Sequence, residues 1–249
     1  MSNIRHFILG KLALLLLIFF VTTASGAQSL LDQPMVEKYL LREDEVLEYG
    51  VTVKGIPAGT QIMQVDGKMR LDGHEVYHIE SKSKVNKFFN IFYPFSNESE
   101  SFIRSSNFHP LYYRKKIRDG GYKGLTLVEF DPANQSARIT RNQKHTEIVI
   151  PMGIQDELSA IYLLRTKDMQ VGGKYEFHAL VGTKSIKATV EVLRIEELKT
   201  ILGKLKTIVV RTTLRDLTVW LTNDHFRIPV KIEASTKLGN LVSKLEKIR

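Results

Sequence analysis

The residues of this chain that could carry acid–base or metal chemistry are its histidines and its paired carboxylates. His74 and His78 lie four positions apart in an extended stretch, which separates them by roughly 13 Å along a strand, too far for one metal ion. No HExxH or other ligand spacing accompanies them, so we predict no metal site. Glu98 and Glu100 share one face of a strand and could act as acid and base only across a substrate cleft. A solvated surface beside lysine and arginine is the simpler interpretation.

No nucleophile elbow, phosphate-cradling loop or dinucleotide fingerprint occurs in the sequence. The two glycines of GIPAGT, residues 55–60, lie between two extended stretches, and without a following helix N-terminus they offer no phosphate site. Asp224 and His225 are adjacent and point to opposite sides of an extended chain, so a turn is the simpler interpretation. We therefore predict no catalytic residue, no cofactor and a protein that is not an enzyme.

The stretch KVNKFFNIFYPF, residues 84–95, concentrates aromatic side chains that could contact an apolar ligand. Their spacing predicts one or two turns of amphipathic helix that end at Pro94 and are too short to enter a bilayer alone. Either this helix closes the end of a β-structure as ordinary core, or it forms a mobile lip over an apolar cavity. In the second case the ligand-binding residues are aromatic, namely Phe88, Phe89, Phe92, Tyr93 and Phe95, with Trp220 in the wall. The headgroup contacts are then basic, namely Lys82, Lys84 and Lys87.

The elements that must position these residues are short strands. From Glu45 onward, period-two runs are separated by Gly, Pro, Asn or Asp, which predicts antiparallel strands joined by tight turns. The predicted strands are 46–55, 59–67, 74–83, 101–107, 109–121, 125–132, 136–142, 146–151, 174–182, 185–198, 205–214, 217–224, 228–236 and 240–248. One clear helix is predicted at about 156–168, with Asp156 as its N-cap. The fold class is therefore mainly β, with curved antiparallel sheets forming a barrel or two half-barrels and one or two short helices.

The second run of strands resembles the first. Gly73 precedes EVYHIES as Gly203 precedes KTIVVRT, and Pro110 and Pro229 stand in similar strand–turn–Pro–strand steps. We interpret this as an internal duplication within one β-rich domain, 45–249, with repeats at about 45–150 and 170–249 joined by the helix. The alternative is chance, because period-two patterns are degenerate. Curved antiparallel sheets that wrap an interior commonly hold apolar ligands.

The first 27 residues have the pattern of a secretory signal peptide, followed by a lead-in segment at 28–44. Arg5 and Lys11 precede an apolar run at 12–21, which is too short to span a membrane, and small residues lead to a predicted cleavage site after Ala27. Cleavage leaves 34 basic and 27 acidic side chains, a net charge of +7, which favours anionic headgroups or polysaccharide over nucleic acid. An ordinary basic surface is the alternative. We predict a periplasmic protein without a membrane span, and without cysteine it has no disulfide.

A resemblance to a known family is carried by a series of blocks, among them YGVTVKGIPAGT, FFNIFYPFSNESES, HPLYYRKKIRDGGYKG, IPMGIQDELSAIYLLR and VWLTNDHFRIPVKIEASTKLGNLVSKL. In this order they resemble DUF3108, a bacterial exported family of unknown function. One departure lies between VVRTTLRDL and TVWLTND, where the family often carries a longer hairpin. The resemblance implies a signal-bearing, mostly β envelope protein of Gram-negative bacteria and implies no reaction. A looser likeness to periplasmic half-barrels that carry lipoproteins and lipids is an analogy of fold alone.

Three functional hypotheses follow from these patterns. The leading one is a non-enzymatic protein that binds a lipid or other amphipathic ligand inside the curved sheet. The alternative is an envelope module that docks a partner protein through its basic surface and free strand edges. A weaker alternative is a hydrolase acting on envelope polymers, which requires a cleft with converging carboxylates or histidines.

Overall fold

The computed structural model describes residues 26–36, 39, 41–236 and 239–249. The predicted signal peptide therefore lies almost wholly outside the described residues. The helices are α1 (Lys87–Phe92) and α2 (Ser159–Thr166), with a short 3-10 turn η1 (Leu214–Asp216). The strands are β1 (Gln28–Ser29), β2 (Val46–Val53), β3 (Ile56–Leu71), β4 (His74–Val85), β5 (Phe95–Arg104), β6 (Pro110–Asp119), β7 (Tyr122–Asp131), β8 (Ser136–Arg141), β9 (Lys144–Val149), β10 (Lys174–Val181), β11 (Lys184–Thr200), β12 (Gly203–Thr212), β13 (Leu217–Thr222), β14 (Pro229–Thr236) and β15 (Gly239–Ile248).

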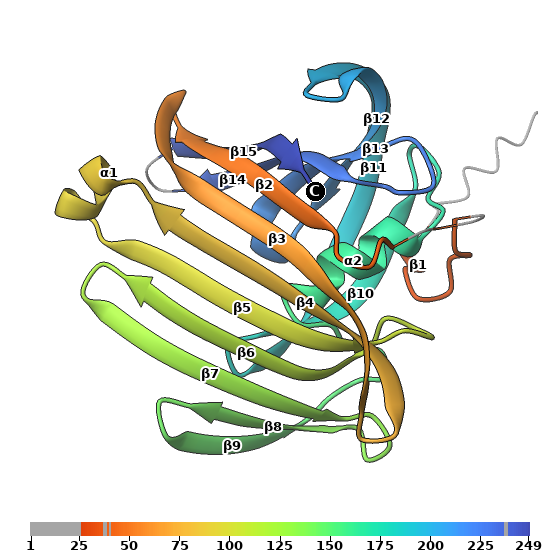
Figure 1. The fold of residues 1–249 in the computed structure, drawn as a ribbon. Coiled ribbons are helices and arrows are strands. Elements are labelled where there is room, and N and C mark those ends of the chain that lie inside the picture. Colours follow the sequence, from red (N-terminus) through yellow and green to blue (C-terminus); the bar gives the residue numbers. More distant parts are fainter. Residues whose placement is uncertain (1–25, 37–38, 40, 237–238) are drawn as a thin grey trace, which may run out of the picture.

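All fifteen strands belong to one curved sheet in the order β1-β10-β11-β12-β13-β14-β15-β2-β3-β4-β5-β6-β7-β8-β9. Two meanders, β2–β9 and β10–β15, join where β15 pairs antiparallel with β2, and the short β1 pairs parallel with β10. The sheet wraps around the molecule, but within the described residues its edges β1 and β9 are not paired with each other (Figure 1). The predicted mainly β, curved antiparallel class is confirmed, in the form of a single open sheet.

The two meanders have shifts in strand register at corresponding places. The long strands β3 and β11 each carry a register shift against the next strand, between Val65 and Lys68 and between Val192 and Arg194. A second shift lies directly after each of two prolines, Pro110 at the start of β6 and Pro229 at the start of β14. This correspondence agrees with the repeats seen in the sequence, and the duplication itself stays a hypothesis.

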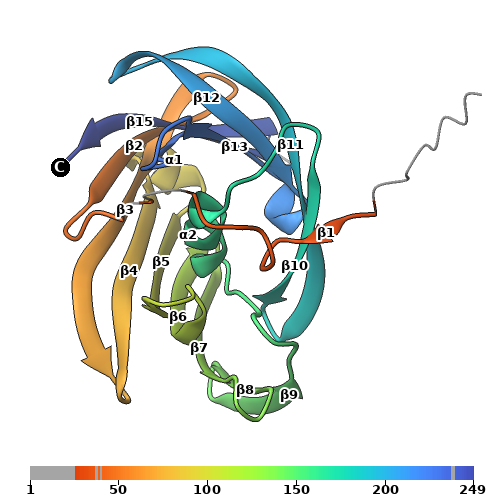
Figure 2. The same cartoon turned by 90° about the vertical axis from the view of Figure 1, so that its right-hand side faces the viewer.

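Helix α2 lies inside the curve of the sheet, between the two meanders (Figure 2). Seven of its residues are buried, namely Ser159, Ala160, Tyr162, Leu163, Leu164, Arg165 and Thr166. Four of them, Ala160, Tyr162, Leu163 and Leu164, join one continuous apolar core with side chains from both meanders, so this part of the interior is filled. Burying a leucine side chain stabilises a fold by roughly 1.5–3 kcal/mol, which explains why an eight-residue helix holds this place. The helix is shorter than the predicted 156–168.

The start of α2 is held by the buried carboxylate of Asp156. Its Oδ1 accepts hydrogen bonds from the backbone N–H groups of Leu158 at 2.7 Å and Ser159 at 2.8 Å, and its Oδ2 accepts one from the Ser101 hydroxyl at 2.6 Å. Burial raises the pKa of Asp156 to about 6, although these hydrogen bonds act to lower it. The predicted capping interaction is present, while the helix itself begins at Ser159.

A buried ion pair fixes the far end of α2. Arg165 is fully buried and donates from Nη1 and Nη2 to the two carboxylate oxygens of Glu45, at 2.7 and 2.9 Å. Nη2 also donates to the carbonyl oxygen of Phe226 at 3.2 Å. Burial acts to lower the pKa of Arg165, but the Tyr39 phenol and the Glu45 carboxylate outweigh it and hold that pKa above its usual value. The pair thus joins α2 to the chain just before β2.

The beginning of the lead-in segment, β1, pairs with the sheet. The backbone N–H of Leu30 donates to the carbonyl of Glu176 at 2.7 Å, and the Leu30 side chain lies in the core. Across the described ranges, the search for a helix long and apolar enough to cross a membrane finds none.

Candidate functional site

The aromatic stretch forms the predicted short helix, α1, at one end of the sheet. The Asn86 side chain accepts a hydrogen bond from the Phe89 N–H at 2.9 Å and caps its start, and the helix stops at Tyr93, just before Pro94. No residue of α1 is buried, and its apolar side chains are among the most exposed of the described residues: Phe88 at 63%, Phe92 at 71% and Ile91 at 77%. The interpretation of this helix as ordinary core is therefore wrong. The sequence of a helix shows which of its sides is apolar, but it does not show whether another part of the protein covers that side.

The other predicted aromatic contacts are placed differently. Phe89 is half-buried at the base of α1, and Phe95 is half-buried at the start of β5. Tyr93 is partly exposed, and its hydroxyl donates to Asp119 at 2.6 Å. Trp220 lies on a strand, β13, as predicted, and is only 5% exposed, while its part in the wall of a ligand site stays a prediction. Its indole N–H donates to Glu196, and the ammonium of Lys231 lies 4.0 Å from the ring centre.

The three predicted headgroup lysines divide into two kinds. Lys82 donates to Glu80 at 2.7 Å and is therefore already paired. Lys84, on β4, and Lys87, on α1, are exposed beside the aromatic helix. Lys84 and Lys87 are therefore the available cations of the three.

A groove of about 380 Å³ lies on the concave side of the sheet, next to α2. Alternate residues of β6 and β7 face it, as the period-two geometry of strands requires. The opposite side comes from the start of α2, the end of β10 and the turn η1. The lining residues are Tyr113, Lys115, Ile117, Asp119, Tyr122, Thr126, Val128, Arg141, Glu157, Leu180, Gly182 and Arg215.

The floor of the groove is apolar and its border carries an ion network. Val128 and Leu180 are buried, whereas Glu157 is paired with both Lys115 and Arg215. Burial acts to raise the pKa of Glu157, but the Lys115 and Arg215 cations outweigh it, so that pKa lies below its usual value. Arg215 reaches the groove from η1, where it adopts a φ of 61° in the tight connection between β12 and β13.

The Tyr113 hydroxyl is a buried polar group that faces the groove. Its side chain is 6% exposed, and its hydroxyl makes no hydrogen bond of normal geometry among the described residues, although the Ser99 hydroxyl lies near. Burial raises the pKa of this phenol well above its usual value, so it remains a neutral donor. A buried donor without a partner costs free energy that a bound acceptor could recover.

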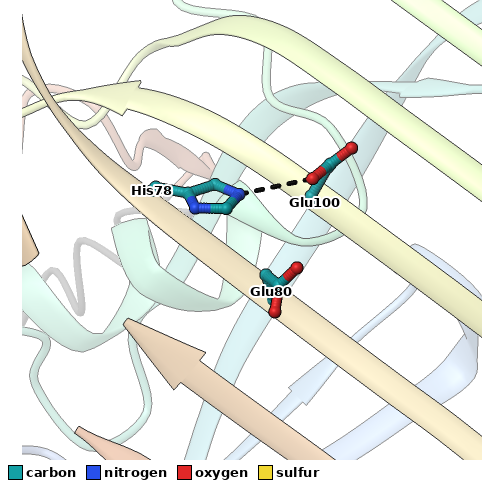
Figure 3. A group of neighbouring side chains, drawn as sticks. All are labelled: His78, Glu80 and Glu100. Atoms are coloured by element: carbon teal, nitrogen blue, oxygen red, sulfur yellow. Dashed lines mark hydrogen bonds and ion pairs between the residues drawn. The ribbon is translucent and has the colours of Figure 1, made fainter. Parts of the chain in front are cut away.

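The outer face of the sheet holds a cluster that the sequence analysis missed: His78, Glu80 and Glu100 (Figure 3). Glu80 on β4 lies directly opposite Glu100 on β5, and His78 Nε2 is 3.4 Å from a Glu100 oxygen. One ligand atom from each of the three lies within 4.8 Å of the others, a donor set suited to a divalent metal.

Both carboxylates of this cluster are already paired, however. Lys82 donates to Glu80 at 2.7 Å, and Arg114 donates to Glu100 at 3.0 Å. A metal ion would have to displace both cations, so the simpler description is an ion-pair network. A motif search could not find this cluster, because it depends on the register between β4 and β5, and the predicted strand 101–107 began one residue after Glu100. Glu98, also on the outer face, lies in register between Lys82 and Lys116, and the outer hollow that it lines contains no second carboxylate.

The chain matches one protein family in sequence and several solved structures in fold. Residues 48–246 match the model of a family described as "Protein of unknown function (DUF3108)". A beta-barrel-like protein of the family DUF1849 from Brucella abortus is similar in structure, with a TM-score of 0.55 and 10% identity, covering 84% of this chain and 99% of that chain. This likeness shows that the β-barrel-like fold recurs.

Two further solved structures score lower. A protein from Parabacteroides distasonis, provisionally described as a lipoprotein, has a TM-score of 0.32 at 11% identity, covering 88% of this chain and 100% of that chain. A protein from Bacteroides fragilis, provisionally described as exported and with a YmcC-like fold, has a TM-score of 0.30 at 10% identity, covering 87% and 99%. Neither score supports an argument about function. No curated protein sequence matches the chain.

Proposed function

Since this chain belongs to the DUF3108 family, whose description names no activity, we propose from its geometry that it binds an amphipathic anion in the concave groove. The observation that carries this proposal is the chemistry of the lining: a floor of Val128 and Leu180 beside the cations Lys115, Arg141 and Arg215. Ligand sites are typically apolar clefts with a few polar groups that orient the ligand, and this groove has that composition.

The size and the charges of the groove limit what it can hold. With about 380 Å³ it is at the small end of ligand sites, and α2 fills the interior next to it, so a single alkyl chain fits better than a bulky lipid. Its three cations exceed its two carboxylates, Glu157 and Asp119, which favours an acidic headgroup. The Tyr113 hydroxyl offers that headgroup a buried hydrogen-bond donor.

A hydrolytic role finds no support in this groove. Glu157 is paired with two cations, and Asp119 accepts from the Tyr93 hydroxyl, so neither carboxylate is free to act as a general acid or base. The groove contains no histidine. Binding without catalysis is therefore the function that we propose, and the periplasm is the compartment that the pattern of residues 1–27 favours.

The proposal is tested by titrating a dansyl-labelled fatty acid into the protein and displacing it with oleate. Thr126→Trp places an indole in the groove and should weaken binding at least about tenfold. Leu127→Trp is the matched control, because Leu127 is the next residue on β7 and points to the opposite face. Arg141→Glu should weaken binding and reduce its salt dependence, whereas Arg138→Glu on the outer face should not. Equal binding by all four variants would place the ligand elsewhere, and no binding by the parent protein would refute the proposal.

Docking of a partner protein remains a second candidate, because β9 is a free edge of the sheet in the described residues. Its Val149 side chain is 84% exposed, and an extended peptide could pair along this edge. Lys144 and Glu147 place charges on the same strand, a pattern that usually discourages such pairing. Loss of a co-purifying partner on Val149→Pro, with fatty-acid binding unchanged, would favour this candidate.

A further inference from the structure

Hydrogen bonds at both ends hold the exposed helix α1 against neighbouring strands. The Asn86 side-chain amide donates to the Pro57 carbonyl at 2.8 Å, and the Asn86 backbone N–H donates to the Ala58 carbonyl at 2.8 Å. At the other end, the Tyr93 hydroxyl donates to Asp119 on β6. The helix is therefore tied to the start of β3 on one side and to the end of β6 on the other, and it projects from the end of the sheet (Figure 1).

The exposed side of α1 is apolar and continuous. The ring of Phe88 lies 5.4 Å from that of Phe92 and 5.6 Å from that of Phe89, and Ile91 is 77% exposed beside them. Ile56, the first residue of β3, is 58% exposed. We call this set, Ile56, Phe88, Ile91 and Phe92, the apolar rim. Leaving four large apolar side chains in water at one end of a fold marks an interaction surface.

Four exposed cations lie at the same end of the sheet as the apolar rim. Lys84, Arg118 and Lys123 occupy one cross-strand row through Ser96 at the α1 end of the sheet, and Lys87 lies on α1 itself. All four are exposed, and none has an ion-pair partner within the described ranges. The nearest carboxylate, Asp119, faces the groove on the other side of the sheet and accepts a hydrogen bond from Tyr93. On the outer face the next row contains Glu98, which is flanked by two lysines in register.

From this arrangement we infer that the apolar rim docks the protein on an anionic lipid surface. Aromatic side chains enter the boundary between headgroups and acyl chains, while neighbouring lysines and arginines bind anionic headgroups. One helical turn is too short to bind alone, so both contributions are needed. A second copy of the chain fits this surface poorly, because two basic rows brought face to face would repel each other.

One end of the groove lies next to α1, the helix that would dock on the lipid surface. Asp119 and Tyr122 line the end of the groove, and Asp119 is bonded to Tyr93 at the end of α1. A protein docked by the rim would therefore hold that end of the groove near the lipid surface. The docking itself does not depend on the groove having a ligand.

The test is co-sedimentation with vesicles of phosphatidylcholine alone or of phosphatidylcholine and phosphatidylglycerol in equal amounts. It uses the chain from Gln28 onward, which is the mature protein that the predicted cleavage after Ala27 would leave. We expect binding only to the anionic vesicles and weaker binding at high salt. The double change Phe88→Ser with Phe92→Ser should lower the partition coefficient at least about tenfold. Lys84→Glu with Lys87→Glu should lower it at least about 25-fold, at roughly fivefold for each cation lost.

Matched controls alter residues of the same kind far from α1 in the fold. Val149→Ser removes an exposed apolar side chain from β9, and Lys144→Glu with Lys184→Glu makes the same change in net charge on other hairpins. All three substitutions should leave vesicle binding within about twofold. Thr126→Trp should also leave it unchanged, which separates docking from ligand binding in the groove.

Three outcomes would overturn the inference. The first is equal binding to neutral and anionic vesicles, and the second is unchanged binding by the α1 variants. The third is a dimer in light scattering that becomes a monomer on Phe88→Ser with Phe92→Ser, because the rim would then be an interface between two copies of the chain.

Discussion

Replacing Arg165 by methionine removes the cation from which both oxygens of Glu45 accept hydrogen bonds. Methionine fills a similar length of space without charge, so the change isolates the ion pair from the packing of α2. Glu45 is 1% exposed and Arg165 is fully buried, so water cannot replace the lost partner without opening the core. Removing one partner of a buried pair typically costs about 3–5 kcal/mol.

A second way of calculating the loss of stability on Arg165→Met gives a similar free energy. A buried carboxylate without a partner can escape its charge by taking up a proton, and for an ordinary glutamate this costs about 4 kcal/mol at pH 7 but only about 1 kcal/mol at pH 5. We therefore expect Arg165→Met to lower the free energy of unfolding by about 4 kcal/mol at pH 7. About 3 kcal/mol of this loss should disappear at pH 5. Asp156 titrates in the same range, but it does so in both proteins and cancels from the difference.

The measurement is urea unfolding at the two pH values, followed by the fluorescence of the single tryptophan, Trp220, which is buried in the fold. Arg138→Met is the control, because its pair with Glu129 is 3.0 Å long but its two side chains are 71% and 52% exposed. Such a pair is worth less than about 1 kcal/mol. A loss as small as that of the control, or a loss equal at pH 5 and pH 7, would refute the reasoning.

The remaining predictions concern exposure, titration and close packing. Phe88→Ser with Phe92→Ser should change the free energy of unfolding by less than about 1 kcal/mol, since both rings face solvent; a larger loss in urea would show that α1 is core after all. The raised pKa of Asp156 contributes stability that is fully present below pH 4 and is lost as the pH rises through 6, up to about 3 kcal/mol. Asp156→Asn should flatten this fall in urea unfolding between pH 4 and pH 7, and an unchanged slope would contradict it. Gly59→Ala should cost about 1–3 kcal/mol in thermal unfolding, because a Cβ there would lie 2.2 Å from a backbone oxygen of β4, whereas Gly121→Ala meets nothing within 4 Å. Equal effects of the two glycine changes would argue against the close approach.

The strands could be predicted from the sequence because their signal is local. Each run from Glu45 onward that was predicted as a strand is a strand in the structure, and the helix with the Asp156 cap is present. Alternation of side chains with period two, bounded by turn residues, reports directly which residues face the two sides of a sheet. Only β1 was missed, since two residues are too few to show a period.

The candidate sites could be predicted only in part from such local patterns. The sequence identified the aromatic stretch, Lys84 and Lys87, which now form one exposed surface, but it left open whether the rings were covered. The groove was not predicted, because its lining comes from β6, β7, β10 and η1, which are distant in the chain. The pairing of His78 with Glu100 likewise depends on the register between β4 and β5.

The sequence by itself determined the β class, the order of the strands, the helix that interrupts them and the composition of the α1 stretch, since propensity, alternation and turn chemistry act over a few residues. Only the tertiary structure decided that one continuous sheet wraps around α2. That outcome depends on β15 pairing with β2, where Leu241 meets Val53, and on Arg165 meeting Glu45 across 120 positions of sequence. Contacts at such separations are chosen by the packing of the whole chain, and no local pattern encodes which face of a strand becomes the inside of the curve.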